Sequence, residues 1–233
     1  MGAGIFGLSV AWVCLGRGAR VRVIDPDGIG AGASGGVLGA LAPHTPDTWT
    51  DTKQLQFEGL IAAGAFWSGV DAASGHRSGY GRIGRLQPIA DARGLALART
   101  RAEQAKTLWR GLADWSVIPA GEAGDWAPRS ATGWLIRDTL SARICPRRAC
   151  TSLAAAIRAG GGEITRDGER QGRVIRATGY QGLQETTDRA GRPLGAGVKG
   201  QAALLRLDAQ GVPQVFAGGL HVVPHADGTV AVG

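Results

Sequence analysis

The sequence predicts an α/β fold, and three observations near its start support that prediction. Gly2, Gly4 and Gly7 form the pattern G-x-G-x-x-G. Apolar residues continue after it at helical spacing until Gly-Arg-Gly at 16–18. The segment ARVRVID, 19–25, then alternates like a β-strand and closes on an acidic residue. A glycine turn, a helix and a strand in this order are typical of a dinucleotide-binding unit, whereas the competing explanation is chance clustering among 39 glycines.

Each glycine has a physical role in such a turn. The first allows the tight bend, the second lets a pyrophosphate approach the backbone, and the third lets the helix and strand pack closely. The free N–H groups and the positive dipole end of the helix then face the anion. Asp25 follows the glycines by about 20 positions, which places its carboxylate where it accepts hydrogen bonds from ribose hydroxyls.

The spacing of apolar residues, together with capping residues, prolines and glycines at the ends of segments, predicts further elements. Apolar residues at helical spacing predict a helix over 54–71, and Asp91 is predicted to cap a second one that runs to about Gly111. Pro146 near the start and glycines at the end predict a third helix within 145–162. Strands are predicted within 81–90, 114–128, 133–139 and 174–175.

The stretch from Gly28 to Pro46 is dominated by glycine and alanine, and we expect a loop there. Such a permissive loop is usual where the backbone passes close to a bulky group, although a plain flexible linker is the alternative. Its residues 32–36 also fit G-x-S-x-G, the nucleophile elbow of serine hydrolases. That elbow needs a strand directly before the serine and a helix directly after it, and neither is predicted here.

Composition narrows the function classes. The chain has 233 residues, 44% of them hydrophobic, and a formal net charge of +7. Its basic residues are scattered arginines without a long basic run, so nucleic-acid binding is disfavoured. Three cysteines without C-x-x-C spacing indicate reduced thiols of a cytoplasmic protein rather than a metal site. The apolar start is too short to span a membrane and lacks a preceding basic region, so neither a membrane span nor a signal peptide is predicted.

Ala177, Thr178 and Gly179 form a small-residue turn directly after the predicted strand at 174–175. Ligands of open α/β sheets lie at the carboxyl ends of the strands. The turn is therefore predicted to form a second wall of the same cofactor site.

With these motifs, the chain resembles the FAD-dependent oxidoreductases of the D-amino-acid oxidase and glycine oxidase group. The resemblance extends over essentially the whole chain, through GAGIFG, VRVID, GASGGVLGALAP, GRLQPIA, ATGYQGL, GVKGQAALL and HVVPHADGTVAVG. It implies a Rossmann-like FAD-binding domain with an interleaved, mainly antiparallel β substrate domain. We assign 1–75 and 140–198 to the former and 76–139 and 199–233 to the latter.

The resemblance also implies positions for the cofactor. Gly2, Gly4 and Gly7, with Ile5 and Phe6 between them, would lie at the pyrophosphate, and Asp25 at the adenosine ribose. Further along the chain, Ser34, Gly35 and Gly36 would follow the phosphates, Gly39, Ala40 and Leu41 would lie near the isoalloxazine, and Ala177, Thr178 and Gly179 would close the FAD pocket.

The chemistry that the resemblance implies is hydride transfer to flavin from the carbon that bears a substrate amine. The resulting imine hydrolyses in water, and oxygen or a quinone accepts the electrons. The substrate would be a small amine or amino acid. Candidate substrate contacts are His44 beside the glycine loop, His221 and His225 in HVVPH, and Arg85 as a partner for a carboxylate.

Two departures from the family pattern predict an incomplete copy of such an enzyme. Met1 stands where a first buried strand should end, and the chain stops at Gly233, where the family continues with a segment that carries a substrate-binding arginine. Three alternatives to an amine oxidase stay open: a non-catalytic remnant, an oxidase acting on modified tRNA, and a nicotinamide-dependent dehydrogenase.

Overall fold

The computed structural model describes all 233 residues and divides into two compact units. Each unit is assembled from three separate stretches of the chain. The first contains 1–37, 67–78 and 145–201, and the second contains 38–66, 79–144 and 202–233. The stretch 38–66 thus makes its contacts within the second unit, whereas the sequence assigned it to the FAD-binding part. The functional division into domains stays a prediction.

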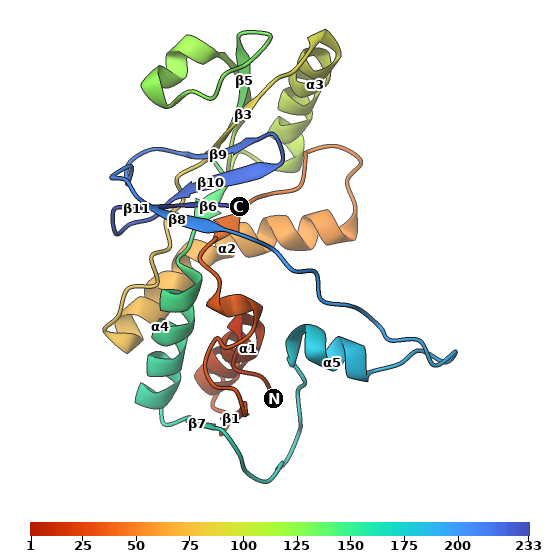
Figure 1. Cartoon of the computed structure of the whole chain (residues 1–233), viewed down its shortest axis with the longest axis vertical. Coiled ribbons are helices and arrows are strands. Elements are labelled where there is room, and N and C mark those ends of the chain that lie inside the picture. Colours follow the sequence, from red (N-terminus) through yellow and green to blue (C-terminus); the bar gives the residue numbers. More distant parts are fainter. The chain divides into compact units, whose positions relative to one another are not determined.

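The first unit is a small α/β arrangement built around one parallel strand pair. Strands β1 and β7 pair in parallel, and helices α1 and α4 pack against each other (Figure 1). The helix interface is apolar, with Leu8 and Ala11 of α1 and Leu153 and Ile157 of α4 all buried. Its elements are α1 (Ile5–Gly16), β1 (Arg22–Ile24), the 3₁₀ turn η1 (Ala33–Gly35), the last part of α2 (Asp51–Ser74), α4 (Pro146–Ala159), β7 (Glu163–Thr165) and α5 (Gly179–Glu185).

Local signals predicted several of these elements correctly. Helix α1 ends at Gly16, directly before Arg17, whose backbone N–H bonds the carbonyls of Cys14 and Leu15. Helix α4 has Pro146 in its first turn, where a missing N–H is not needed. In contrast, the predicted strand at 174–175 is wrong. Val174 and Ile175 are about half exposed. The backbone of this segment forms hydrogen bonds only with Met1, and a single residue is too short a partner for a β-strand pair.

The second unit contains a seven-stranded sheet in the order β4-β5-β3-β9-β10-β11-β8. All of its strand pairs are antiparallel except β3 with β9. The short strands β2 and β6 form a separate antiparallel pair. Its elements are β2 (Ala40–Leu41), most of α2, β3 (Arg85–Pro88), α3 (Ala92–Leu108), β4 (Trp115–Pro119), η2 (Ala120–Trp126), β5 (Trp134–Asp138), β6 (Ala142–Arg143), β8 (Ala203–Arg206), β9 (Gln214–Ala217), β10 (Leu220–Pro224) and β11 (Thr229–Val232).

An aromatic core joins α2 and α3 to one face of this sheet. Phe57 stacks on Trp109, and Trp109 meets Trp115 edge-on with ring centroids 5.9 Å apart. Leu86, Leu135 and Val215 form a second buried cluster. The predicted cap of α3 is confirmed, since the Asp91 carboxylate accepts from Gly94 N–H at 2.7 Å. The mixed α/β architecture with a mainly antiparallel sheet is therefore as the sequence predicts.

No helix is long and apolar enough to cross a membrane.

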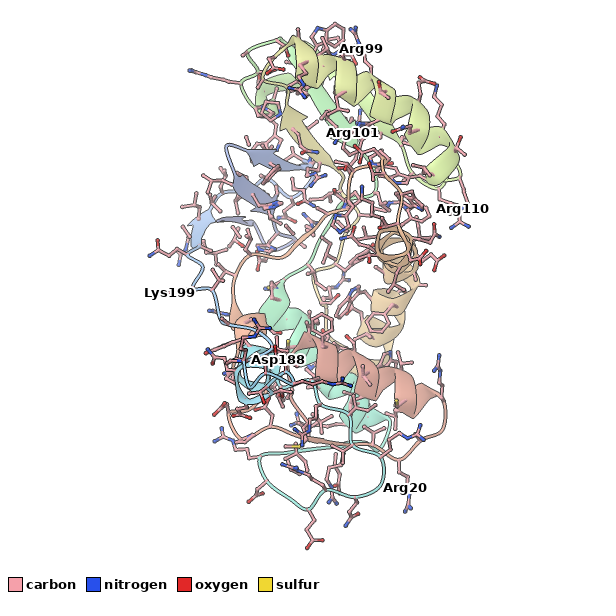
Figure 2. The ribbon with its side chains drawn as sticks, turned by 90° about the vertical axis from the view of Figure 1, so that its right-hand side faces the viewer. Arg20, Arg99, Arg101, Arg110, Asp188 and Lys199 are labelled. Atoms are coloured by element: carbon pink, nitrogen blue, oxygen red, sulfur yellow. The ribbon has the colours of Figure 1, made fainter.

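Asp47, in the loop that precedes α2, connects this loop to helix α3 through an ion pair. Its carboxylate lies 2.6 Å from Arg101 Nε and 3.1 Å from Lys53 Nζ (Arg101 is labelled in Figure 2). Burial alone would raise the pKa of Asp47, but hydrogen bonds from Thr45, Arg101 and Lys53 lower it to about 2. Because the folded pKa lies below the ordinary value of 3.8, this stabilisation is complete above that value and is lost as pH falls through about 2.

We therefore expect Asp47→Asn to lower the free energy of unfolding by about 1–2 kcal/mol at neutral pH. The difference from the unsubstituted chain should shrink between about pH 4 and pH 2, as urea unfolding at a series of pH values will show. Asp125→Asn is the control, because Asp125 is exposed on η2 and forms no ion pair. A difference that does not depend on pH would contradict this account.

Candidate functional site

The glycine turn of the first unit lies between β1 and the segment around Ala177. Gly2 donates its backbone N–H to Ile24 at 2.9 Å, and Ala177 donates to Met1 at 2.8 Å. Gly2 has a φ of +100°, which favours glycine, and a Cβ there would overlap the carbonyl of Ala177. Only glycine at position 2 allows these backbones to approach so closely.

Helix α1 begins directly at this turn and presents unused N–H groups. Its first helical hydrogen bond runs from Leu8 N–H to Gly4 at 3.0 Å. Ile5 donates to the Ser34 hydroxyl at 2.9 Å, whereas the N–H groups of Phe6 and Gly7 have no acceptor in the chain. A Cβ on Gly7 would overlap the carbonyl of Gly2. The helix start is thus held tightly against the turn, with free donors suited to a phosphate.

Asp25 organises the same turn from the end of β1. Its carboxylate accepts from Ala3 N–H at 2.6 Å, Asp27 N–H at 3.0 Å and Gly28 N–H at 3.3 Å. A carboxylate offers about four lone-pair sites, so one remains for an incoming hydroxyl. This capacity fits a ribose, and the three backbone bonds show that Asp25 also holds the glycine turn in shape.

Ser34, Gly35 and Gly36 lie on or beside η1 and reach α1 through Ser34. The Ser34 hydroxyl accepts from Ile5, as described, and interacts with the Cys150 thiol, whose pKa burial raises. Arg147 donates to the Gly35 carbonyl at 2.6 Å, which ties η1 to α4. The glycine loop is therefore anchored at both its serine and its following glycine rather than hanging free.

The remaining predicted cofactor positions fall in both units. Ala177 lies beside Gly2, and Thr178 and Gly179 follow it at the start of α5. Ile5 and Phe6 are the first two residues of α1, and Phe6 is 80% exposed. Gly39, Ala40 and Leu41 belong to the second unit. There Ile144 donates to the Gly39 carbonyl at 2.9 Å, and a Cβ on Gly39 would overlap the carbonyl of Ile144.

A buried polar cluster lies on the sheet of the second unit. Arg85 donates from Nε to Asp138 at 3.1 Å, and both side chains are buried. Asp138 also accepts from Leu140 N–H, and from Ser141 through both its N–H and its hydroxyl. Arg85 thus keeps its Nη1 and Nη2 groups for another partner, while its Nε is fixed by a carboxylate.

His221 and Gln214 continue this cluster on the neighbouring strands. Gln214 pairs in register with Arg85, and its Nε2 donates to the Ala142 carbonyl at 3.0 Å while its buried Oε1 has no partner. His221 packs on Phe216 with ring centroids 4.6 Å apart, and its buried Nδ1 has no partner. Burial lowers the pKa of His221, and the positive charge of Arg85 lowers it further, so its imidazole is neutral at pH 7.

The predicted catalytic residues have unlike surroundings. His44 is exposed, and its backbone N–H donates to Gln56 at 2.7 Å. His225 is buried at the end of β10, where its backbone N–H donates to Thr229 at 2.8 Å. Arg85 is buried beside Asp138. Sequence reasoning missed Asp138 and Gln214, because only the strand register brings them beside Arg85.

Comparisons with known proteins identify the family of the chain. The family model for FAD dependent oxidoreductase, DAO, matches residues 1–233. The search of curated proteins found no match. Among solved structures, glycine oxidase from Geobacillus kaustophilus superimposes with a TM-score of 0.74 at 18% identity, over 100% of this chain and 69% of that one.

Two further structures share the fold. L-amino acid deaminase from Proteus vulgaris gives a TM-score of 0.72 at 19% identity, over 99% of this chain and 59% of that one. Iminodiacetate oxidase from Chelativorans sp. BNC1 gives 0.68 at 22% identity, over 100% of this chain and 69% of that one. This chain therefore spans about three fifths to two thirds of the length of these proteins. Because the family match extends over every residue, the chain belongs to the DAO family of FAD dependent oxidoreductases, and its cofactor is FAD.

Proposed function

We propose that the protein oxidises the CH–NH group of a small amino acid or amine. The observation that carries the proposal is the family match over the whole chain, supported by structural neighbours that are described as glycine oxidase, iminodiacetate oxidase and L-amino acid deaminase. When bound, FAD supplies the electron acceptor for a hydride from the substrate carbon. The protein's own contribution is binding, orientation and exclusion of water.

The first unit is proposed as the FAD-binding part. The free N–H groups of Phe6 and Gly7 would bind the pyrophosphate, and Asp25 would bind a ribose hydroxyl through its remaining lone pair. Ser34, Gly35 and Gly36 would position α1 from the phosphate side, and Ala177, Thr178 and Gly179 would close the pocket. In the second unit, Gly39, Ala40 and Leu41 are proposed to lie at the isoalloxazine.

The polar cluster of the second unit is proposed as the substrate-binding part. The free Nη groups of Arg85 suit a substrate carboxylate, because Asp138 already fixes Nε and thereby orients the guanidinium plane. His221 and Gln214, whose buried Nδ1 and Oε1 atoms have no partner, are the other polar side chains of this cluster. His44 and His225 remain further candidate contacts.

The test is reduction of the bound cofactor by amines. The purified chain is incubated with FAD, passed through gel filtration, and mixed without oxygen with glycine, sarcosine, iminodiacetate or single amino acids. We expect at least one of these compounds to bleach the visible absorbance of the flavin, whichever electron acceptor the enzyme uses. A chain that retains FAD and is bleached by none of them would contradict amine oxidation. Loss of all flavin on the column would contradict catalysis by this chain and favour the non-catalytic alternative.

A further inference from the structure

Helix α4 packs against both α1 and the loop that carries η1, all within the first unit (Figure 1). We call residues 30–36 the η1 loop. Two α4 side chains, Arg147 and Cys150, contact this loop, and their spacing of three positions puts them on the same face of the helix. The proposed function uses the η1 loop for the FAD phosphates but gives neither of these α4 side chains a role in cofactor binding.

Arg147 fixes the η1 loop at the residue after Ser34. Its Nε donates to the Gly35 carbonyl at 2.6 Å, and the backbone N–H of Gly35 donates to the Gly32 carbonyl at 3.0 Å. A Cβ on Gly35 would overlap the carbonyl of Gly30, so the loop is folded tightly on itself. A carbonyl oxygen that faced a phosphate would repel it, and the bond from Arg147 holds the Gly35 carbonyl toward a guanidinium instead.

Cys150 supplies the second contact with the η1 loop, at the Ser34 hydroxyl. Its side chain is 1% exposed and hydrogen-bonds Ser34. It also lies against the backbone of Gly30, where an added Cβ would be 3.5 Å from the Cys150 Cβ and 3.6 Å from its Sγ. Burial raises the pKa of the Cys150 thiol above its ordinary value, so the thiol keeps its proton at pH 7 and can donate it in a hydrogen bond.

The hydrogen bonds of the Ser34 hydroxyl leave its proton for a ligand. A hydroxyl has two lone pairs and one proton. The backbone N–H of Ile5, at 2.9 Å, occupies one lone pair, and the S–H of Cys150 can occupy the other. A phosphate is a far stronger acceptor than a neutral thiol, so the Ser34 proton is directed to a phosphate wherever one is bound. Ser34 then adds a donor to the unused N–H groups of Phe6 and Gly7 at the start of α1.

We propose that Cys150 and Arg147 are positioning residues for FAD binding. Cys150 donates to the Ser34 hydroxyl and so directs the Ser34 proton to the phosphates, while Arg147 holds the carbonyl of the next residue away from them. Both residues act through the η1 loop rather than by touching the cofactor. The inference rests on the proposed place of the FAD phosphates at the glycine turn, and it adds α4 to the elements on which cofactor affinity depends.

The test of Cys150 is a double-mutant cycle on FAD affinity, measured as quenching of FAD fluorescence by the full chain. We expect Cys150→Ala to weaken FAD binding about three- to tenfold, and Cys150→Ser, whose O–H still donates, to stay within about twofold of the unsubstituted chain. In a Ser34→Ala background, Cys150→Ala should change the affinity by less than about twofold, because the hydroxyl that Cys150 orients is gone. A merely structural effect of Cys150→Ala, such as a small cavity, would persist in that background.

Matched arginine variants test the other positioning residue. Arg147→Gln should weaken FAD binding about three- to tenfold, because the Gly35 carbonyl loses its charged donor. Arg158→Gln is the control, since it removes the same charge from the exposed last turn of the same helix, and it should leave the affinity within about twofold.

The outcomes separate this inference from the proposed function. The inference alone is overturned if Cys150→Ala leaves FAD affinity unchanged or weakens it equally with and without Ser34. It is also overturned if Cys150→Ser binds as weakly as Cys150→Ala, or if Arg147→Gln and Arg158→Gln behave alike. If Ser34→Ala binds FAD as tightly as the unsubstituted chain, or if the unsubstituted chain binds no FAD, the proposed place of the phosphates is overturned together with the inference.

Discussion

Gly7→Ala is expected to weaken FAD binding by about 100-fold or more, because the new methyl group would overlap the Gly2 carbonyl. The overlap is with backbone, so no side chain can move aside to relieve it. Helix α1 would have to shift away from the glycine turn, and the N–H groups of Phe6 and Gly7 would move with it. Titration of FAD, followed by quenching of its fluorescence, measures the effect.

Gly16→Ala is the matched control on the same helix. Gly16 is the last residue of α1, and a Cβ there would meet no atom within 4 Å. We expect unchanged FAD affinity and a free energy of unfolding that is equal or higher by about 0.5–1 kcal/mol, since alanine restricts the unfolded chain. If Gly7→Ala bound FAD as tightly as Gly16→Ala, the glycine turn would not be the pyrophosphate site.

Asp138→Asn is expected to lower the free energy of unfolding by about 3–5 kcal/mol. The substitution removes the negative charge that compensates Arg85, and both side chains are buried in the sheet. It also replaces an oxygen that accepts hydrogen bonds by an amide that donates, beside donors from Leu140 and Ser141. Urea unfolding at neutral pH measures the loss.

An exposed ion pair provides the comparison for this prediction. Glu103→Gln breaks the pair with Lys106, whose side chains are 72% and 70% exposed, and should change the free energy of unfolding by less than about 0.5 kcal/mol. Comparable losses in Asp138→Asn and Glu103→Gln would show that the buried pair is not a main support of the sheet. A folded Asp138→Asn protein would also show how far the fixed Arg85 plane matters for substrate affinity.

The local features of the first unit were readable from the sequence. Glycine spacing, the apolar run to Gly16 and the alternation before Asp25 predicted the turn, α1 and β1. The starts of α3 and α4 were equally readable, because the Asp91 cap and the proline at position 146 act on backbone groups within a few residues. Such signals depend on neighbours in the chain and need no knowledge of the tertiary fold.

The strand at 174–175 shows where local reasoning failed. Val174 and Ile175 have strong β propensity, yet a strand also needs a partner of sufficient length. This segment is bonded to Met1 alone, so it stays irregular and half exposed. Pairing is a property of two segments, and propensity describes only one.

The motifs of this chain and its resemblance to one family were enough to predict the FAD-binding fold, the glycine turn before α1, and the acidic residue directly after β1. Which residues the buried polar groups bond to could be learned only from the tertiary structure. Arg85 and Asp138 are 53 positions apart and meet through antiparallel register, and Gln214 joins them through a parallel pair. The pairing register of strands is set by the packing of whole strands, so the spacing of residues within a short stretch of sequence does not reveal it.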